Sequence, residues 1–137
     1  MTEVQISGDL SNINLRNANL SNADLMDSDL SNAHLTNADL SNADLTSATL
    51  YNSSLPYTDL SATGLAKATL SGTDLRYAYL ADADLTNADL SNVTLTNSSL
   101  PRVTLTNTVL SGANLTDATL NPATLTHAIL ENTTLLI

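Results

Sequence analysis

The chain contains no cysteine, phenylalanine or tryptophan among its 137 residues, and only 4 basic residues against 14 acidic ones. Without cysteine, disulfides and thiol chemistry are excluded, although a cysteine-free chain suits any cellular compartment. A net charge of −10 argues against nucleic-acid binding through phosphates, because such binding requires clustered lysine and arginine. The start of the chain lacks the basic region and apolar run of a signal peptide, and no segment is apolar for long enough to cross a bilayer. We therefore expect a cytoplasmic protein without membrane contact.

Leucine, by contrast, stands at every fifth position from Leu10 to Leu135, which makes 26 leucines in one register. In an α-helix, leucines five residues apart would scatter around the axis, since each residue turns the chain by about 100°. In a flat strand they would alternate between the two faces. A chain that turns a corner every five residues points each leucine inward, so the spacing predicts a coil with one leucine per side.

The residues between the leucines repeat as well, so the repeating unit is a pentapeptide. Its clearest copies are SNADL at 21–25 and 41–45, and TNADL at 36–40 and 86–90. The residue two before leucine is nearly always small, which suits a narrow interior. Asn, Asp, Ser and Thr dominate the other slots. They suit corners, because their side chains bond nearby backbone and Asn tolerates left-handed conformations.

With these repeats the chain resembles the pentapeptide-repeat family, whose pattern is a small residue, Asp or Asn, Leu or Phe, then Ser, Thr or Arg, then any residue. The resemblance extends from about residue 8 to residue 135. It implies an all-β fold, a right-handed quadrilateral parallel β-helix solenoid with four pentapeptides per coil. We expect a single domain over residues 1–137, without a helical cap. About six and a half coils at about 4.8 Å each would give a rod roughly 31 Å long.

The regular repeats offer little material for catalysis or metal binding, because no insertion exists that could wall a pocket. Asp24 and Asp44 would stack at about the spacing of a retaining-glycosidase pair, but on a solvated face where nothing separates their pKa values. The two histidines, His34 and His127, fall on different sides of the coil. We therefore predict that the protein is not an enzyme and has no catalytic residue, no cofactor and no metal site.

Departures from the repeat concentrate in residues 51–79. The candidate partner patch consists of Tyr51, Tyr57, Arg76, Tyr77 and Tyr79. Because Tyr57 and Tyr77 are 20 residues apart, they should stack in adjacent coils, and Arg76 should lie beside Pro56. Tyr and Arg are enriched in binding hot spots. An aromatic ladder that fixes the register of the coils would give the same pattern.

The C-terminal coil is a second candidate contact. An end coil of a solenoid exposes apolar core and unpaired backbone, and the sequence finishes here on apolar residues without a polar lid. We expect end-to-end association into a two-fold homodimer. The predicted contact residues are Leu130, Leu135, Leu136 and Ile137.

The leading functional interpretation is a non-enzymatic structural or protein-interaction module with an unknown protein partner. Resemblance to family members that mimic DNA suggests an alternative, an inhibitor or protector of DNA gyrase. Charge density argues against it, because a duplex of roughly 31 Å carries roughly 18 phosphate charges, whereas this chain has a net charge of −10 spread over four sides. A remote alternative is ice binding through stacked threonines at 104–106 and 124–126, a face of only two coils.

Overall fold

A tight turn follows the leucine of each repeat. The N–H three residues after leucine donates to the leucine carbonyl, as from Ala38 to Leu35 at 2.9 Å. The second residue after leucine has φ between 53° and 61° wherever it is neither glycine nor proline. A positive φ at this position alone defines a type II turn, in which Asn and Gly are the least strained residues. The exception is the turn containing the cis peptide Asn121–Pro122, whose proline cannot adopt a positive φ.

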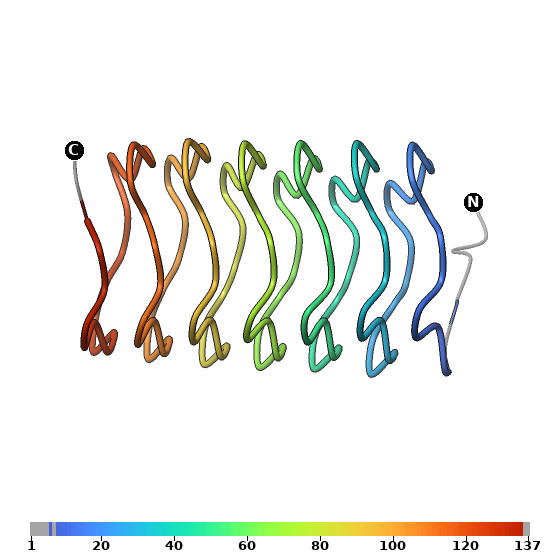
Figure 1. Ribbon diagram of the computed structural model, residues 1–137, viewed down its shortest axis with the longest axis horizontal. Coiled ribbons are helices and arrows are strands. Elements are labelled where there is room, and N and C mark those ends of the chain that lie inside the picture. The colour runs from blue at the N-terminus through green and yellow to red at the C-terminus, as the bar shows by residue number, and fades with distance from the viewer. Residues whose placement is uncertain (1–5, 7, 136–137) are drawn as a thin grey trace.

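Four such turns complete one coil, because parallel bridges join residues 20 positions apart, as from Asp39 to Asp59 and on to Tyr79. The structure, a computed structural model, describes residue 6 and residues 8–135. Figure 1 shows the coils stacked along one axis into a rod. The bridges thus give the coil of four pentapeptides that the family resemblance implied.

The four sides of the coil are named here by their leucines. Side A carries Leu10 and every twentieth residue after it, side B the series from Leu15, side C the series from Leu20 and side D the series from Leu25. The two residues after each leucine form a corner. Corner AB follows the leucines of side A, and corners BC, CD and DA follow in the same way.

Among the described residues there is no helix, and no strand is longer than an isolated bridge. The sequence predicted an all-β coil, but the β-structure is confined to the single residue before each leucine. The reason is geometric. A turn takes two of every five residues, and the remaining three span a side before the next turn begins.

Leucine and the small residue two before it form the interior. From Leu25 to Leu115 every repeat leucine is at most 2% exposed. Where Ser or Thr replaces the usual Ala, its hydroxyl donates to a leucine carbonyl. Ser28 bonds Leu25 in its own turn at 2.7 Å, and Thr58 bonds Leu35 in the preceding coil at 2.8 Å. No buried side-chain polar atom in the described part of the chain lacks a partner, so the core accepts these hydroxyls.

The two ends of the rod differ in exposure. At the N-terminal end, Leu10 and Ile13 are partly buried and pack against the core. At the other end, Leu125, Leu130 and Leu135 are 41%, 47% and 46% exposed. The other two residues of the predicted dimer contact, Leu136 and Ile137, lie outside the described residues.

Candidate interaction surface

Tyr57 and Tyr77 stack at corner BC, which confirms the arrangement that the 20-residue period predicts. Their ring centroids are 4.9 Å apart and their planes differ by 3°. The two residues remain 51% and 43% exposed, and their φ angles are 61° and 59°. A bulky residue is strained in this left-handed conformation. The backbone conformation therefore does not explain why tyrosine occupies these two turns.

Arg76 takes the same turn position as Pro56 one coil earlier, as predicted, and its carbonyl accepts the N–H of Tyr57 at 3.0 Å. Its guanidinium forms a bidentate pair with Asp74, Nε to Oδ1 at 2.9 Å and Nη2 to Oδ2 at 2.8 Å. These hydrogen bonds raise the pKa of Arg76. Burial acts to raise the pKa of Asp74, but the hydrogen bonds and charge of Arg76 outweigh it and lower that pKa. The pair leaves this corner without net charge.

The other two predicted tyrosines lie elsewhere on the coil. Tyr51 is 49% exposed and occupies corner AB, so the width of side B separates it from corner BC. Tyr79 is 54% exposed and belongs to the bridged column of side C. The five candidate residues therefore do not form the compact spot that the sequence suggested. Three of them share corner BC, and the other two flank it.

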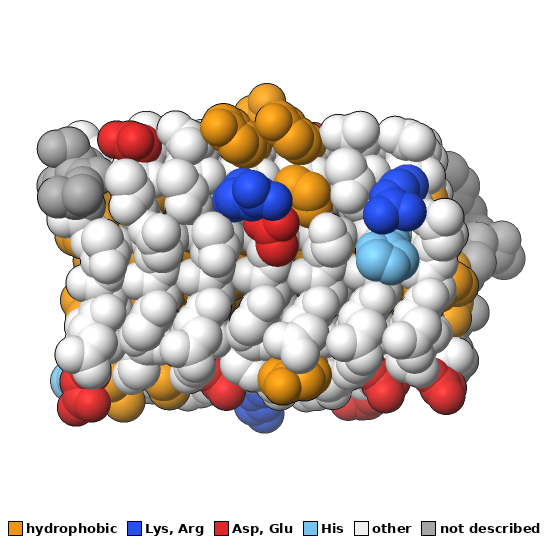
Figure 2. All heavy atoms as spheres, viewed as in Figure 1, with side chains coloured by type: hydrophobic (Ala, Val, Ile, Leu, Met, Phe, Trp, Pro, Cys, Tyr) orange, Lys and Arg blue, Asp and Glu red, His pale blue; other side chains and the backbone are white. Residues whose placement is uncertain are grey.

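The outward column of side B, formed by the bridged residues, is almost uncharged. It consists of Asn14, His34, Ser54, Asp74, Thr94, Asn114 and Thr134. The one carboxylate in it is paired with Arg76. The columns of the other three sides contain eight aspartates: Asp9, Asp29 and Asp89 on side A, Asp39 and Asp59 on side C, and Asp24, Asp44 and Asp84 on side D. Figure 2 shows a face of the first kind, mostly uncharged, with hydrophobic side chains projecting from one edge beside a basic one.

The aspartates and asparagines of these columns also bond the backbone. The N–H directly after leucine has no backbone acceptor, and the Asp or Asn directly before leucine accepts it. Asp39 accepts from Ser41 at 2.9 Å. All twelve Asp and Asn residues at this position do the same. The hydroxyl and N–H of Ser41 lower the pKa of Asp39. The acids therefore stabilise turns, a role that the sequence analysis did not assign to them.

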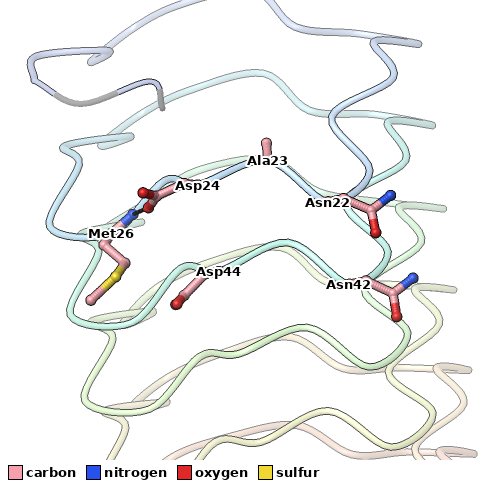
Figure 3. Close-up of a pocket in the computed structure, with 6 residues that line it drawn as sticks. All are labelled: Asn22, Ala23, Asp24, Met26, Asn42 and Asp44. Carbon is pink, nitrogen blue, oxygen red and sulfur yellow. Dashed lines mark hydrogen bonds between the residues drawn. The ribbon is translucent and has the colours of Figure 1, made fainter. Parts of the chain in front are cut away.

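A shallow hollow lies on side D where Asp24 and Asp44 stack. Its volume is about 190 Å³, and its lining is Asn22, Ala23, Asp24, Met26, Asn42 and Asp44. Figure 3 shows the two asparagines at one end and both carboxylates toward Met26 at the other. One carboxylate accepts the N–H of Met26 at 3.2 Å and the other that of Thr46 at 2.9 Å. Their surroundings are alike, and such an arrangement does not divide the roles of acid and base.

Repeats account for most of the chain. A family profile described as pentapeptide repeats matches in 8 copies, over residues 8–46, 28–63, 43–76, 65–100 and 98–135. The chain belongs to the pentapeptide-repeat family. Pentapeptide-repeat proteins form right-handed β-helices and are in general non-enzymatic structural modules.

Several solved pentapeptide-repeat structures are similar to this one. HetL from the cyanobacterium Nostoc sp. strain PCC 7120, involved in heterocyst differentiation regulation, is 25% identical with a TM-score of 0.60, over 97% of this chain and 85% of that one. Rfr23 from the cyanobacterium Cyanothece 51142 is 33% identical with a TM-score of 0.43, over 77% and 63%. Trypsin-treated QnrB1, a plasmid-mediated fluoroquinolone resistance protein, is 18% identical with a TM-score of 0.47, over 96% and 84%. Among curated proteins, none matches the chain significantly.

Sequence reasoning missed an ion pair at corner CD of this pentapeptide-repeat protein. Arg102 Nε and Nη2 donate to Asp82 Oδ1 and Oδ2, each at 2.6 Å. These hydrogen bonds raise the pKa of Arg102 and lower that of Asp82. The two residues are 20 apart in the same turn position, so the period itself was the signal. Both side chains are about half exposed, and a pair of this kind contributes little to stability.

The histidines do not converge with other ligands. His34 lies on side B, with Nδ1 3.5 Å from Nη2 of Arg16, whereas His127 lies at corner DA. Over residues 8–135 and residue 6, no three His, Asp or Glu side chains are grouped to hold a metal ion. The same residues include no helix with the length and apolar character needed to cross a membrane.

Proposed function

We propose that this pentapeptide-repeat protein is a non-enzymatic protein-interaction module that contacts its partner through side B and corner BC. We infer one domain of about six and a half coils, a rod of roughly 31 Å. HetL, which is similar along almost the whole chain, is involved in the regulation of heterocyst differentiation. A rod without a deep cleft can take part in regulation by presenting a surface to another protein.

The observation that carries this proposal is the uneven charge of the four sides. Eight outward aspartates on sides A, C and D repel an acidic surface, whereas side B carries one carboxylate already paired with Arg76. Like charges facing each other across an interface cost several kcal/mol. Side B avoids that cost and offers hydroxyl and amide groups that can pair with a polar partner surface.

The tyrosines at corner BC support the same side. The repeat residues at this corner are Thr and Asn, as at 36–37 and 96–97, but Pro56–Tyr57 and Arg76–Tyr77 replace them. Residues held in sparsely populated backbone conformations tend to occur at functional positions. Half-exposed tyrosines beside an arginine also have the composition of a binding hot spot. Because their stack also stabilises the register of the coils, a test has to separate folding from binding.

The test restores the ordinary repeat at corner BC of the full chain. The corner variant combines Tyr57→Asn, Tyr77→Asn, Asp74→Asn and Arg76→Thr. Asn is favoured where φ is near 60°, and an Asn at position 74 can still accept the N–H of residue 76. We therefore expect the variant to unfold at the same temperature as the wild type or higher.

The matched control is Asp39→Asn with Asp59→Asn, which changes side C and keeps both turn hydrogen bonds. Proteins retained on each immobilised form are identified by mass spectrometry, and the affinity of each is then measured with purified components. A partner that binds the wild type and the control but binds the corner variant at least about tenfold more weakly supports the proposal. A partner whose affinity falls only in the side C control would overturn it.

We also infer contact between copies of the chain at the C-terminal coil. Leu125, Leu130 and Leu135 expose apolar surface there, and the proposed contact includes Leu136 and Ile137. Burying such surface favours association. Light scattering should show a dimer that Leu130→Asn with Leu135→Asn dissociates. A wild-type mass of 14.4 kDa at every concentration would contradict this inference.

The acid columns favour a second candidate function, a DNA-like surface for DNA gyrase. Asp24 and Asp44 on side D, and Asp39 and Asp59 on side C, present carboxylates in adjacent coils. A supercoiling assay tests this directly. Inhibition that disappears in the Asp39→Asn and Asp59→Asn variant would favour this function over the first, and no inhibition at high protein concentration would end it.

A further inference from the structure

The tyrosine pair at corner BC has a chemical property that is independent of any partner. The two rings are nearly parallel with centroids 4.9 Å apart, and each residue is about half exposed. The chain has no cysteine or tryptophan, so no such side chain is present to be oxidised in their place. We propose that Tyr57 and Tyr77 form an intramolecular dityrosine cross-link when the protein meets a one-electron oxidant, such as a haem peroxidase with hydrogen peroxide.

The reaction is balanced as follows. Each phenol gives one electron to the oxidant and loses its hydroxyl proton, which leaves two phenoxyl radicals. A carbon–carbon bond forms between the carbons next to the two phenolic oxygens. The hydrogen on each of those carbons then moves to the oxygen of its own ring and restores both phenols. One hydrogen peroxide accepts the two electrons and two protons and becomes two waters.

The stack places the reacting rings close to the distance that coupling requires. Reacting atoms in a productive geometry are about 3–3.5 Å apart, so the rings have to approach by on the order of 1–2 Å. Exposed side chains move over such distances within nanoseconds. The coils beneath stay in register, because the N–H of Tyr57 donates to the carbonyl of Arg76 at 3.0 Å.

The other two tyrosines provide an internal comparison. Tyr51 and Tyr79 are 49% and 54% exposed, at least as accessible as the members of the pair. The structure gives neither of them a stacked ring, and the bridged neighbours of Tyr79 are Asp59 and Ser99. An oxidant therefore reaches all four, but radicals at Tyr51 and Tyr79 have to find a ring on another molecule.

Proximity also makes the intramolecular reaction independent of protein concentration. Two groups tethered in one molecule meet at an effective concentration in the millimolar range or above, so at about 10 μM protein coupling within a molecule is favoured by about a hundredfold. The product joins two adjacent coils across the 20 residues from Tyr57 to Tyr77. We expect it to slow unfolding in urea relative to the untreated protein.

The experiment treats the full chain with a haem peroxidase and hydrogen peroxide at several protein concentrations. Dityrosine fluorescence is measured in the monomer fraction, and the linked peptides are identified by mass spectrometry. The expected product is a monomer that has lost two hydrogen atoms, with residues 57 and 77 linked and a yield that does not depend on concentration. Oxidation of Met26 adds an oxygen instead, so its mass change is distinct.

Four single Tyr→Phe variants provide the controls, and phenylalanine keeps a ring in the stack. Each variant is first shown to unfold like the wild type. Tyr57→Phe and Tyr77→Phe should abolish dityrosine in the monomer, whereas Tyr51→Phe and Tyr79→Phe should leave it unchanged. The proposal is overturned if dityrosine occurs only in dimers whose yield rises with concentration, or if monomer cross-linking persists in Tyr57→Phe.

Discussion

Each repeat contains one residue with a left-handed backbone, and Asn occupies that position more often than any other residue. Asn and Gly adopt this conformation at low cost, whereas other residues are strained there. Gly72 has a further reason, because a Cβ at this residue would collide with Oδ1 of Asn52 in the preceding coil. Where the position holds Ala62 or Lys67 instead, the turn is maintained by the stacked coils rather than by local preference.

Ala62 is therefore a position where stability can be gained. Its φ is 55° and its side chain is exposed, so Ala62→Asn should raise the free energy of unfolding by about 0.5–1 kcal/mol through reduced backbone strain. Urea unfolding measures the change. Ala66→Asn is the control, because residue 66 precedes the left-handed position of its turn. An equal gain at both sites would contradict the explanation.

The turn hydrogen bonds of the aspartates give a second prediction. Asp39 accepts from the N–H and the hydroxyl of Ser41 at 2.9 Å and 2.6 Å. Asp39→Ala should lower the free energy of unfolding by about 0.5–1 kcal/mol, whereas Asp39→Asn keeps an acceptor and should change it less. Thermal unfolding of the two variants provides the comparison. Equal losses would show that the acceptor is unimportant.

The same residue makes stability depend on pH. Because hydrogen bonds lower the pKa of Asp39 in the folded state, its contribution is complete above the unfolded carboxyl pKa of about 3.9 and is lost as pH falls through the lower folded value. Between pH 7 and pH 3, the melting temperature of Asp39→Asn should therefore decline less than that of the wild type. A parallel decline of the two would contradict this linkage.

At the level of the coil, the sequence predicted the register and therefore the stacked neighbours. The Tyr57–Tyr77 stack follows directly from a 20-residue period once four repeats form a coil. The same period could have predicted the Asp82–Arg102 pair. What spacing does not contain is side-chain direction. Asp74 turns toward Arg76 in its own repeat rather than toward the next coil, and that choice depends on the local hydrogen bonds at each corner.

The buried hydroxyls test how one coil is joined to the next. Thr58 is fully buried, and its Oγ1 donates to the Leu35 carbonyl of the preceding coil at 2.8 Å. Thr58→Val keeps the shape, because Val93 and Val103 occupy the equivalent slot elsewhere. We expect the loss of this hydrogen bond to lower the free energy of unfolding by about 1 kcal/mol in urea unfolding. A variant as stable as the wild type would mean that the added methyl offsets the lost bond.

Across the whole molecule, each coil contacts only the coils before and after it, as the bridges between residues 20 apart show. Stability in such a solenoid is approximately a sum of coil and interface terms. The interior leucines are at most 2% exposed, but those of the last coil are nearly half exposed. The rod should therefore have a stable centre and a weaker C-terminal end, although its repeats are almost identical in sequence.

Two leucine truncations measure this difference along the rod. Leu70 is fully buried, and Leu70→Ala should cost about 3 kcal/mol or more, because it removes buried methyl groups and leaves a cavity. Leu125 is 41% exposed, and Leu125→Ala removes less buried surface, so its cost should be about 1 kcal/mol. Urea unfolding gives both values, and hydrogen exchange should show faster opening of the last coil than of the central ones. Equal costs at the two sites would mean that the end coil is as well packed as the centre, which is the outcome expected if copies of the chain bury it by associating end to end.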